Sequence, residues 1–81
     1  MTSVNILINN FSKVREFHRI ITEYEGDFDL IQGRYIIDAK SLLGIFSLDI
    51  SQPLKLVMHN DAGAEAALNG IHDFLATAEE E

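Results

Sequence analysis

Residues 33–50 read GRYIIDAKSLLGIFSLDI, and this run combines a strand with a short helix. Ile36 and Ile37 are β-branched residues of the kind that favours strands. Ser41 follows, and its side chain can accept a hydrogen bond from a free backbone N–H group at the start of a helix. Three apolar residues then recur at helical spacing: Leu42, Ile45 and Phe46. The run therefore predicts a strand at residues 34–39 and a serine-capped helix after it.

The residues before this run predict a strand, a helix and a second strand. Residues 3–8 alternate weakly, as in an edge or half-buried strand. Ser12 is positioned to cap a helix that ends near Gly26, a natural C-terminal stop. Residues 28–32 form the next strand, and Gln32 and Gly33 form the hairpin turn that follows. The apolar face of the helix consists of Val14, Phe17, Ile20, Ile21 and Tyr24.

The residues after this run predict one more strand and one more helix. Gln52 and Pro53 break the chain, and apolar residues alternate from Leu54 to Met58. Asn60 or Asp61 then caps a last helix. The three glutamates at residues 79–81 follow its end, and because negative charge there opposes the helix dipole, this tail is expected to fray. The core side of this helix is expected to consist of Ala64, Ala67, Leu68, Ile71, Leu75 and Ala78.

This order of elements predicts an α+β fold with one sheet and helices on a single face, because that is the natural two-layer solution. The pattern equally permits a ferredoxin-like split, which usually lacks the short middle helix. The 81 residues suffice for one small domain.

Composition excludes several classes of protein. The chain has no Cys, so we expect no disulfide and no thiolate metal site, and a cytoplasmic location is the simplest. No signal peptide and no apolar run of about 18 residues is present, so no membrane span is expected. The formal net charge of −7 makes nucleic acid an unsuitable partner.

Residues 40–48, KSLLGIFSL, resemble the Lys-Ser-Ile/Leu-Met-Gly-Val/Leu-Met-Ser-Leu segment of HPr, the histidine-containing phosphocarrier of the sugar phosphotransferase system. The last helix fits the family moderately, and the N-terminal part fits it weakly. The resemblance implies an HPr-like open-faced sandwich over residues 1–81, with a four-stranded antiparallel sheet and three helices on one face.

The family's phosphate-accepting histidine has no counterpart when the chain is aligned on Gly26. Lys13 then takes the position of the histidine, Arg15 that of the motif's arginine, and Glu16 that of its proline, while Phe11 replaces the preceding glycine. A lysine ammonium has no lone pair at neutral pH with which to attack a phosphoryl group.

Two other roles remain open for this region. Ser12, Lys13 and Arg15 either bind an anion at the helix start or form an ordinary solvated helix start. His18 is either a phosphate acceptor or a partly buried structural histidine, and as an acceptor it would lack the N–H groups of the helix terminus.

The sequence predicts neither a metal site nor an enzyme. His18, His59 and His72 do not show the i, i+4 spacing of metal ligands. The chain also lacks a Gly-rich phosphate loop and a nucleophile elbow. We therefore expect no catalytic residue, no metal and no cofactor.

The resemblance further implies that Ser41 is a regulatory phosphorylation site, although helix capping alone would also explain a serine there. The candidate partner-binding residues are Leu42, Leu43, Ile45, Phe46 and Leu48. Most of them are expected to face the core and one or two to be exposed.

Together these features predict a divergent HPr-like regulator, similar to catabolite repression HPr, that binds proteins without the usual histidine phosphorelay. Its partners would be proteins of the phosphotransferase or carbon-regulation type. The alternatives are an active phosphocarrier that uses His18, and a stand-alone anion- or ligand-binding module.

Overall fold

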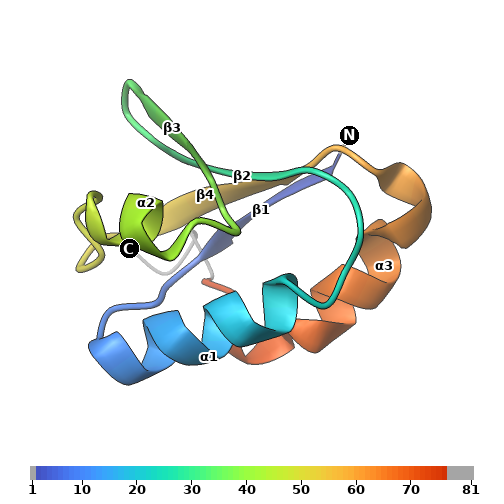
Figure 1. Ribbon diagram of the computed structural model, residues 1–81, viewed down its shortest axis with the longest axis horizontal. Coiled ribbons are helices and arrows are strands. Elements are labelled where there is room, and N and C mark those ends of the chain that lie inside the picture. The colour runs from blue at the N-terminus through green and yellow to red at the C-terminus, as the bar shows by residue number, and fades with distance from the viewer. Residues whose placement is uncertain (1, 77–81) are drawn as a thin grey trace.

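The strands and helices follow one another in the predicted order in the computed structural model, which describes residues 2–76 (Figure 1). The elements are β1 (Thr2–Ile6), α1 (Phe11–Ile21), β2 (Phe28–Gln32), β3 (Tyr35–Asp38), α2 (Leu42–Phe46), β4 (Leu54–Met58), α3 (Asp61–Gly70) and the short 3-10 helix η1 (His72–Phe74). The short middle helix α2 is present, which favours the HPr-like arrangement over a ferredoxin-like split.

The four strands form one antiparallel sheet in the order β1-β4-β2-β3. In its register Ile6 lies opposite Leu54, and Leu30 lies opposite both Leu56 and Ile37. Helices α1 and α3 lie side by side across one face of the sheet, and α2 follows the outer strand β3 (Figure 1). The predicted α+β open-faced sandwich is confirmed.

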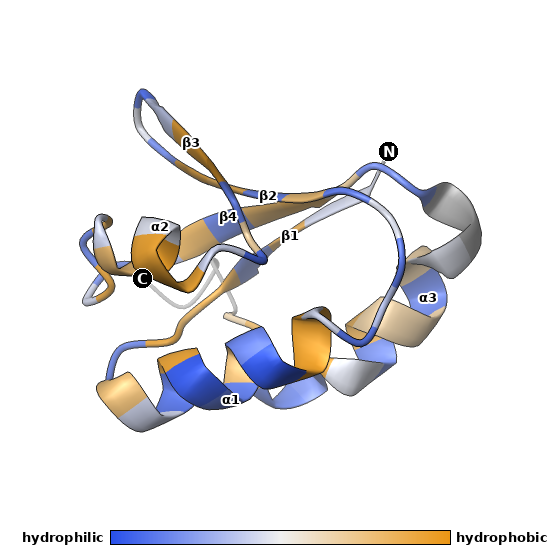
Figure 2. Ribbon diagram, in the orientation of Figure 1, coloured by the Kyte–Doolittle hydropathy of each residue, from blue (hydrophilic) through white to orange (hydrophobic). Residues whose placement is uncertain are grey.

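The hydrophobic core lies between the sheet and the helices and takes its buried residues from β1, β2, β4 and every helix. Figure 2 shows apolar and polar residues interspersed along these elements. In β1, for example, Ile6 is fully buried while Ser3 and Asn5 are exposed. The Phe17 ring packs edge-on against the Phe74 ring, with centroids 6.1 Å apart. The largest buried side chains are Phe17, Ile6, Ile8, Ile21, Leu30, Ile45, Leu54, Leu56, Met58, Ile71 and Val14.

The β2–β3 hairpin turn is Gly33–Arg34, one residue later than the sequence suggested. Gln32 already pairs with Tyr35 in the sheet, so it belongs to the strand. Gly33 has φ of 59° and Arg34 has a negative φ, which matches a type II′ turn with glycine in its first position.

The C-terminal part departs from the predicted continuous helix. The chain leaves α3 at Gly70 and enters η1, which resets the helical period. Phe74 is therefore buried, whereas Leu75, which we expected on the core side, is exposed and bridges to Ile6 beside β1. Ala78 and the three terminal glutamates lie outside the described residues. At the other end of the chain, β1 stops at Ile6, two residues earlier than predicted.

Two glycines of α3 give a matched prediction. A Cβ on Gly70 would collide with the hydroxyl and ring of Tyr24, whereas a Cβ on Gly63 would meet only the Asn60 side-chain nitrogen at 3.7 Å. Gly70→Ala should therefore lower the free energy of unfolding by about 1–3 kcal/mol. Gly63→Ala should raise it by about 0.5–1 kcal/mol, because alanine is the better helix former. Urea unfolding measures both, and a stabilised Gly70→Ala protein would contradict this packing.

Candidate functional site

Helix α1 is capped by Asn10 and not by Ser12. The Asn10 side chain accepts a hydrogen bond from the Lys13 backbone N–H at 2.9 Å, and its carbonyl accepts one from the Val14 N–H at 3.0 Å. Ser12 is exposed within the first turn. The N–H groups of Phe11 and Ser12 have no hydrogen-bond partner among residues 2–76, as is usual for the first turn of a helix.

The cationic side chains near this helix start are directed at different neighbours. The Lys13 ammonium donates to the Asn9 side-chain oxygen at 3.4 Å. The Arg15 guanidinium lies 5.8 Å from the centroid of the Phe11 ring, a cation–π distance. Both side chains are exposed. The residues predicted to bind an anion thus flank the helix start without converging on one point.

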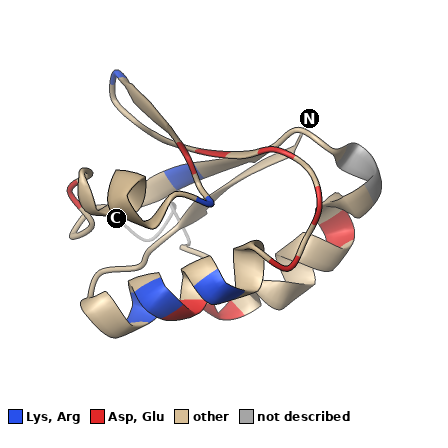
Figure 3. Ribbon diagram, viewed as in Figure 1, with Lys and Arg blue, Asp and Glu red and all other residues tan. Residues whose placement is uncertain are grey.

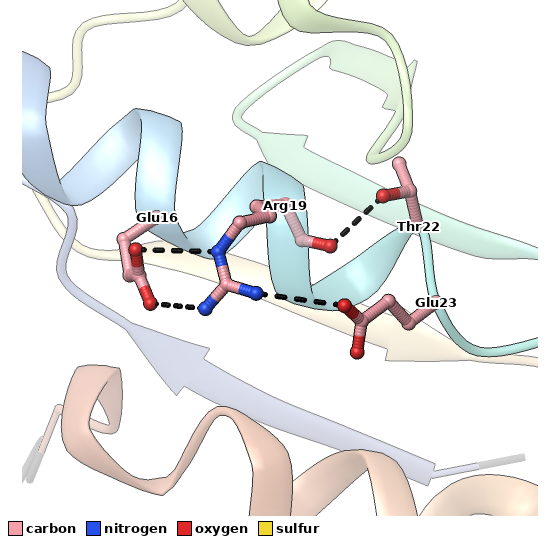
Figure 4. A network of polar contacts seen from close by, with 4 residues as sticks. All are labelled: Glu16, Arg19, Thr22 and Glu23. Atoms are coloured by element: carbon pink, nitrogen blue, oxygen red, sulfur yellow. Dashed lines mark hydrogen bonds and ion pairs between the residues drawn. The ribbon is translucent and has the colours of Figure 1, made fainter.

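The negative charge of Glu16 is balanced by an arginine of the same helix. Its carboxylate accepts two hydrogen bonds from Arg19, which also reaches Glu23 at 3.5 Å, while Thr22 donates to the Arg19 carbonyl (Figure 4). The hydrogen bond from Arg19 holds the pKa of Glu16 below its ordinary value, and the same contact raises the pKa of Arg19. The acid at the position of the motif's proline is therefore already paired with an arginine.

His18 is half-buried and contacts the corner between β3 and α2. Its ring nitrogen Nε2 lies 2.9 Å from the carbonyl oxygen of Lys40. A carbonyl can only accept a hydrogen bond, so Nε2 carries the proton and Nδ1 the lone pair in the neutral ring. An open groove of about 670 Å³ runs along this side of α1, lined by Ser12, Arg15, Glu16, His18, Arg19, Thr22 and Leu42.

Ser41 caps α2, as its position in the sequence predicts. Its hydroxyl oxygen accepts a hydrogen bond from the Gly44 N–H at 3.1 Å, and the residue is exposed. Just before it, the Lys40 ammonium is turned away from the serine and donates to the Tyr24 carbonyl at 2.6 Å.

The candidate partner-binding residues divide between core and surface. Ile45 and Leu48 are buried core residues, so a partner cannot contact them directly, whereas Leu42 is half-buried and lines the groove beside α1. Leu43 is 83% exposed and Phe46 is 37% exposed. Leu43 and Phe46 are therefore the exposed members of this set, in which one or two exposed residues were expected.

Sequence reasoning missed Phe11 as part of this surface. Phe11 is 59% exposed, and its ring stacks on that of Phe46 with centroids 5.4 Å apart and an angle of 19° between the planes. We call Phe11, Leu43 and Phe46 the α1–α2 patch. Contact between residues so far apart in the chain leaves no periodic signal. The only available sign was an aromatic residue in an otherwise polar break.

The remaining histidines do not form a metal site. His59 Nε2 lies 2.9 Å from an Asp29 carboxylate oxygen, and His72 is exposed beside Asp73. No group of three or more histidine or acidic residues in the described part of the chain could hold a metal ion. Within residues 2–76, every helix is too short or too polar to cross a membrane.

The revised cap at Asn10 gives a second matched prediction. Asn10→Ala removes the acceptor for the Lys13 N–H and should lower the free energy of unfolding by about 0.5–2 kcal/mol. Ser12→Ala should change it by less than about 0.5 kcal/mol, since Ser12 makes no capping contact. Denaturant unfolding separates the two variants, and the reverse order would restore Ser12 as the cap.

Two solved structures resemble this chain over most of its length. HPr-C-His from Thermoanaerobacter tengcongensis has a TM-score of 0.76 at 26% identity and covers 90% of this chain and 89% of that one. Phosphocarrier protein HPr from Bacillus anthracis has a TM-score of 0.69 at 21% identity, with coverage of 93% and 94%. The sequence matches no protein-family model and no curated protein. The fold is HPr-like, and the likeness to HPr-C-His at 26% identity supports the HPr family for this chain.

Proposed function

We propose that residues 1–81 form a single HPr-like domain, a divergent cytoplasmic member of the phosphotransferase-system family that regulates other proteins by binding them. It is not an enzyme and does not relay phosphate through the usual histidine. Its partners are proteins of the phosphotransferase or carbon-regulation type. The α1–α2 patch carries this proposal, because an exposed aromatic stack is costly to leave in water and is typical of the centre of a protein interface.

The proposal assigns the usual histidine position to Lys13, whose ammonium cannot act as the nucleophile. Phe11 supports this assignment, because its ring lies against Phe46 and beneath Arg15. The Arg15 guanidinium thus already contacts the face of the Phe11 ring, at the position where the motif's arginine would bind a phosphoryl group. A surface of this composition suits the apolar side chains of a protein partner better than it suits phosphate transfer.

Ser41 is the proposed regulatory site. Its hydroxyl is exposed and caps α2, the same short helix that carries Leu43 and Phe46. A phosphoryl group there would bring roughly −1.5 to −2 units of charge to the border of the α1–α2 patch. Because Lys40 donates to Tyr24, no ammonium of the preceding residue neutralises that charge. Phosphorylation would therefore change the charge that a docking partner meets.

One observation favours a second candidate, a phosphocarrier that uses His18. The bond from Nε2 to the Lys40 carbonyl leaves Nδ1 with the lone pair, and the ring lines a groove together with Arg15 and Arg19. Against this candidate, His18 lies in the interior of α1, where backbone N–H groups are already bonded within the helix.

Intact-mass measurement after two incubations tests the proposal. One tube contains phosphoenolpyruvate and enzyme I, and the other contains ATP and the HPr serine kinase. We expect one phosphoryl group to be gained only with the kinase and to be lost in Ser41→Ala. Ser47→Ala is the matched control, because this exposed serine ends the same helix and should leave the modification unchanged.

A mass gain only with enzyme I that disappears in His18→Ala would replace the regulator by a phosphocarrier. No mass gain in either tube would contradict the proposed phosphorylation of Ser41 and would leave the anion- or ligand-binding module as the remaining hypothesis. That reading would in turn require phosphate to shift the amide resonances of Ser12, Lys13 and Arg15.

A further inference from the structure

The two edges of the sheet differ in what covers them. Beside β1, the Leu7 N–H donates to the Phe74 carbonyl and the Ala76 N–H donates to the Asn5 carbonyl, both at 2.8 Å. Beside β3, the other outer strand, residues 2–76 supply no further strand. An open edge can pair with another strand unless charge, proline or a bulge blocks it.

The backbone of β3 is suited to such pairing. The Ala39 N–H donates to the Phe28 carbonyl at 2.8 Å, so hydrogen-bonded pairs with β2 recur at every second residue from there. Ile36 therefore directs its N–H and carbonyl groups away from β2, toward the open edge. The strand reads YIID, so its one charged residue is Asp38 at its end, and it has neither the proline nor the lysine that usually protects an edge.

Several side chains near the tip of this hairpin are exposed. Tyr35 is 68% exposed and Ile36 is 65% exposed, and the hairpin tip projects from the rest of the molecule (Figure 1). Arg34 in the turn has no hydrogen bond or ion pair among residues 2–76. Asp38 is exposed, lies directly across from Asp29 and makes no ion pair in the same part of the chain, although one of its carboxylate oxygens accepts the Lys40 N–H at 2.9 Å.

We infer that β3 pairs with β3 of a second copy of this chain, antiparallel, about a twofold axis at Ile36. In this register, residues whose numbers add up to 72 lie opposite each other. Arg34 of each copy then lies opposite Asp38 of the other, and Tyr35 lies opposite Ile37. Opposed residues of an antiparallel pair project from the same face, so each pair can form a contact.

Charge complementarity favours a second copy over an unrelated strand. Positive charge lies at the hairpin tip and negative charge at the far end of β3 (Figure 3). Antiparallel pairing of the strand with itself brings these opposite ends together twice. It also places a guanidinium beside Asp38, which lies across from the like-charged Asp29 and whose carboxylate accepts a hydrogen bond from the Lys40 N–H. A strand of other sequence would have to match this spacing by chance.

The interface is small, so the dimer is weak. It consists of the Ile36 pair, with two backbone hydrogen bonds, and the flanking pairs, well below the area of a standard interface. We expect a dissociation constant on the order of 0.1–1 mM. This surface is separate from the α1–α2 patch, so the inference does not depend on the proposed function.

Charge exchange tests the pairing directly. Arg34→Asp places like charges opposite each other in both outer pairs, and Asp38→Arg does the same with the opposite sign. Each variant alone should self-associate at least about tenfold more weakly than the natural chain. An equimolar mixture of the two variants should associate as a heterodimer. In it the introduced aspartate faces the introduced arginine, and the unchanged Asp38 of the first variant faces the unchanged Arg34 of the second. Sedimentation equilibrium up to about 1 mM protein measures all of these species.

Two controls keep the test independent of folding and of the other surface. Ile36→Lys should abolish association at the centre of the edge, and circular dichroism verifies that each variant is folded. Leu43→Asp removes an apolar residue of the α1–α2 patch that is even more exposed than Ile36, and it should leave the dimer unchanged. A chain that stays monomeric at about 1 mM would overturn the inference. So would association that Leu43→Asp abolishes and Ile36→Lys does not.

Discussion

The contacts of Lys40 connect the parts of the structure on which its candidate surfaces depend. The Lys40 N–H donates to an Asp38 carboxylate oxygen at 2.9 Å, and its carbonyl accepts from His18 of α1 at the same distance. Its ammonium donates to the Tyr24 carbonyl beyond the end of α1 and lies 5.3 Å from the centroid of the Phe28 ring. One residue thus joins α1 and β2 to the corner between β3 and α2. Because this corner is fixed, the first turn of α2 and the start of α1 hold a constant relative position.

That constraint explains why the α1–α2 patch can exist. Phe11 and Phe46 lie at opposite ends of their helices, and they stack only if α1 and α2 keep their present separation. The stack leaves apolar surface in water beside an exposed serine, an arrangement that binding of another protein would relieve. The half-buried His18 contributes to the same constraint from within α1, so its present contact is sufficiently explained by packing. The open edge of β3 adjoins this region only at Asp38, so the chain offers two separate surfaces, one on the helices and one at the edge of the sheet.

The sequence predicted local features well and contacts between distant residues poorly. Ser41 was identified as a cap because the signal lies within four residues, and the strand at residues 28–32 was bounded by clear turn residues. Asn10 and Ser12 are both good capping residues, and the spacing of the apolar face could not choose between them. Leu75 was misplaced because a helix period was extended past Gly70, where the chain turns to pair with β1. The contact between Phe11 and Phe46 depends on tertiary structure alone, so no local pattern could reveal it. The roles of Ser41, Lys13 and His18 remain predictions.

The tautomer of His18 tests the Lys40-centred constraint most directly. Long-range ¹H–¹⁵N correlation spectra of the ring nitrogens distinguish a protonated Nε2 from a protonated Nδ1. The present structure predicts the neutral form with the proton on Nε2, and a slowly exchanging proton because it is shared with the Lys40 carbonyl. A ring protonated on Nδ1, or one that averages both forms, would show that α1 is not tied to this corner. The fixed geometry of the α1–α2 patch would then lose its basis.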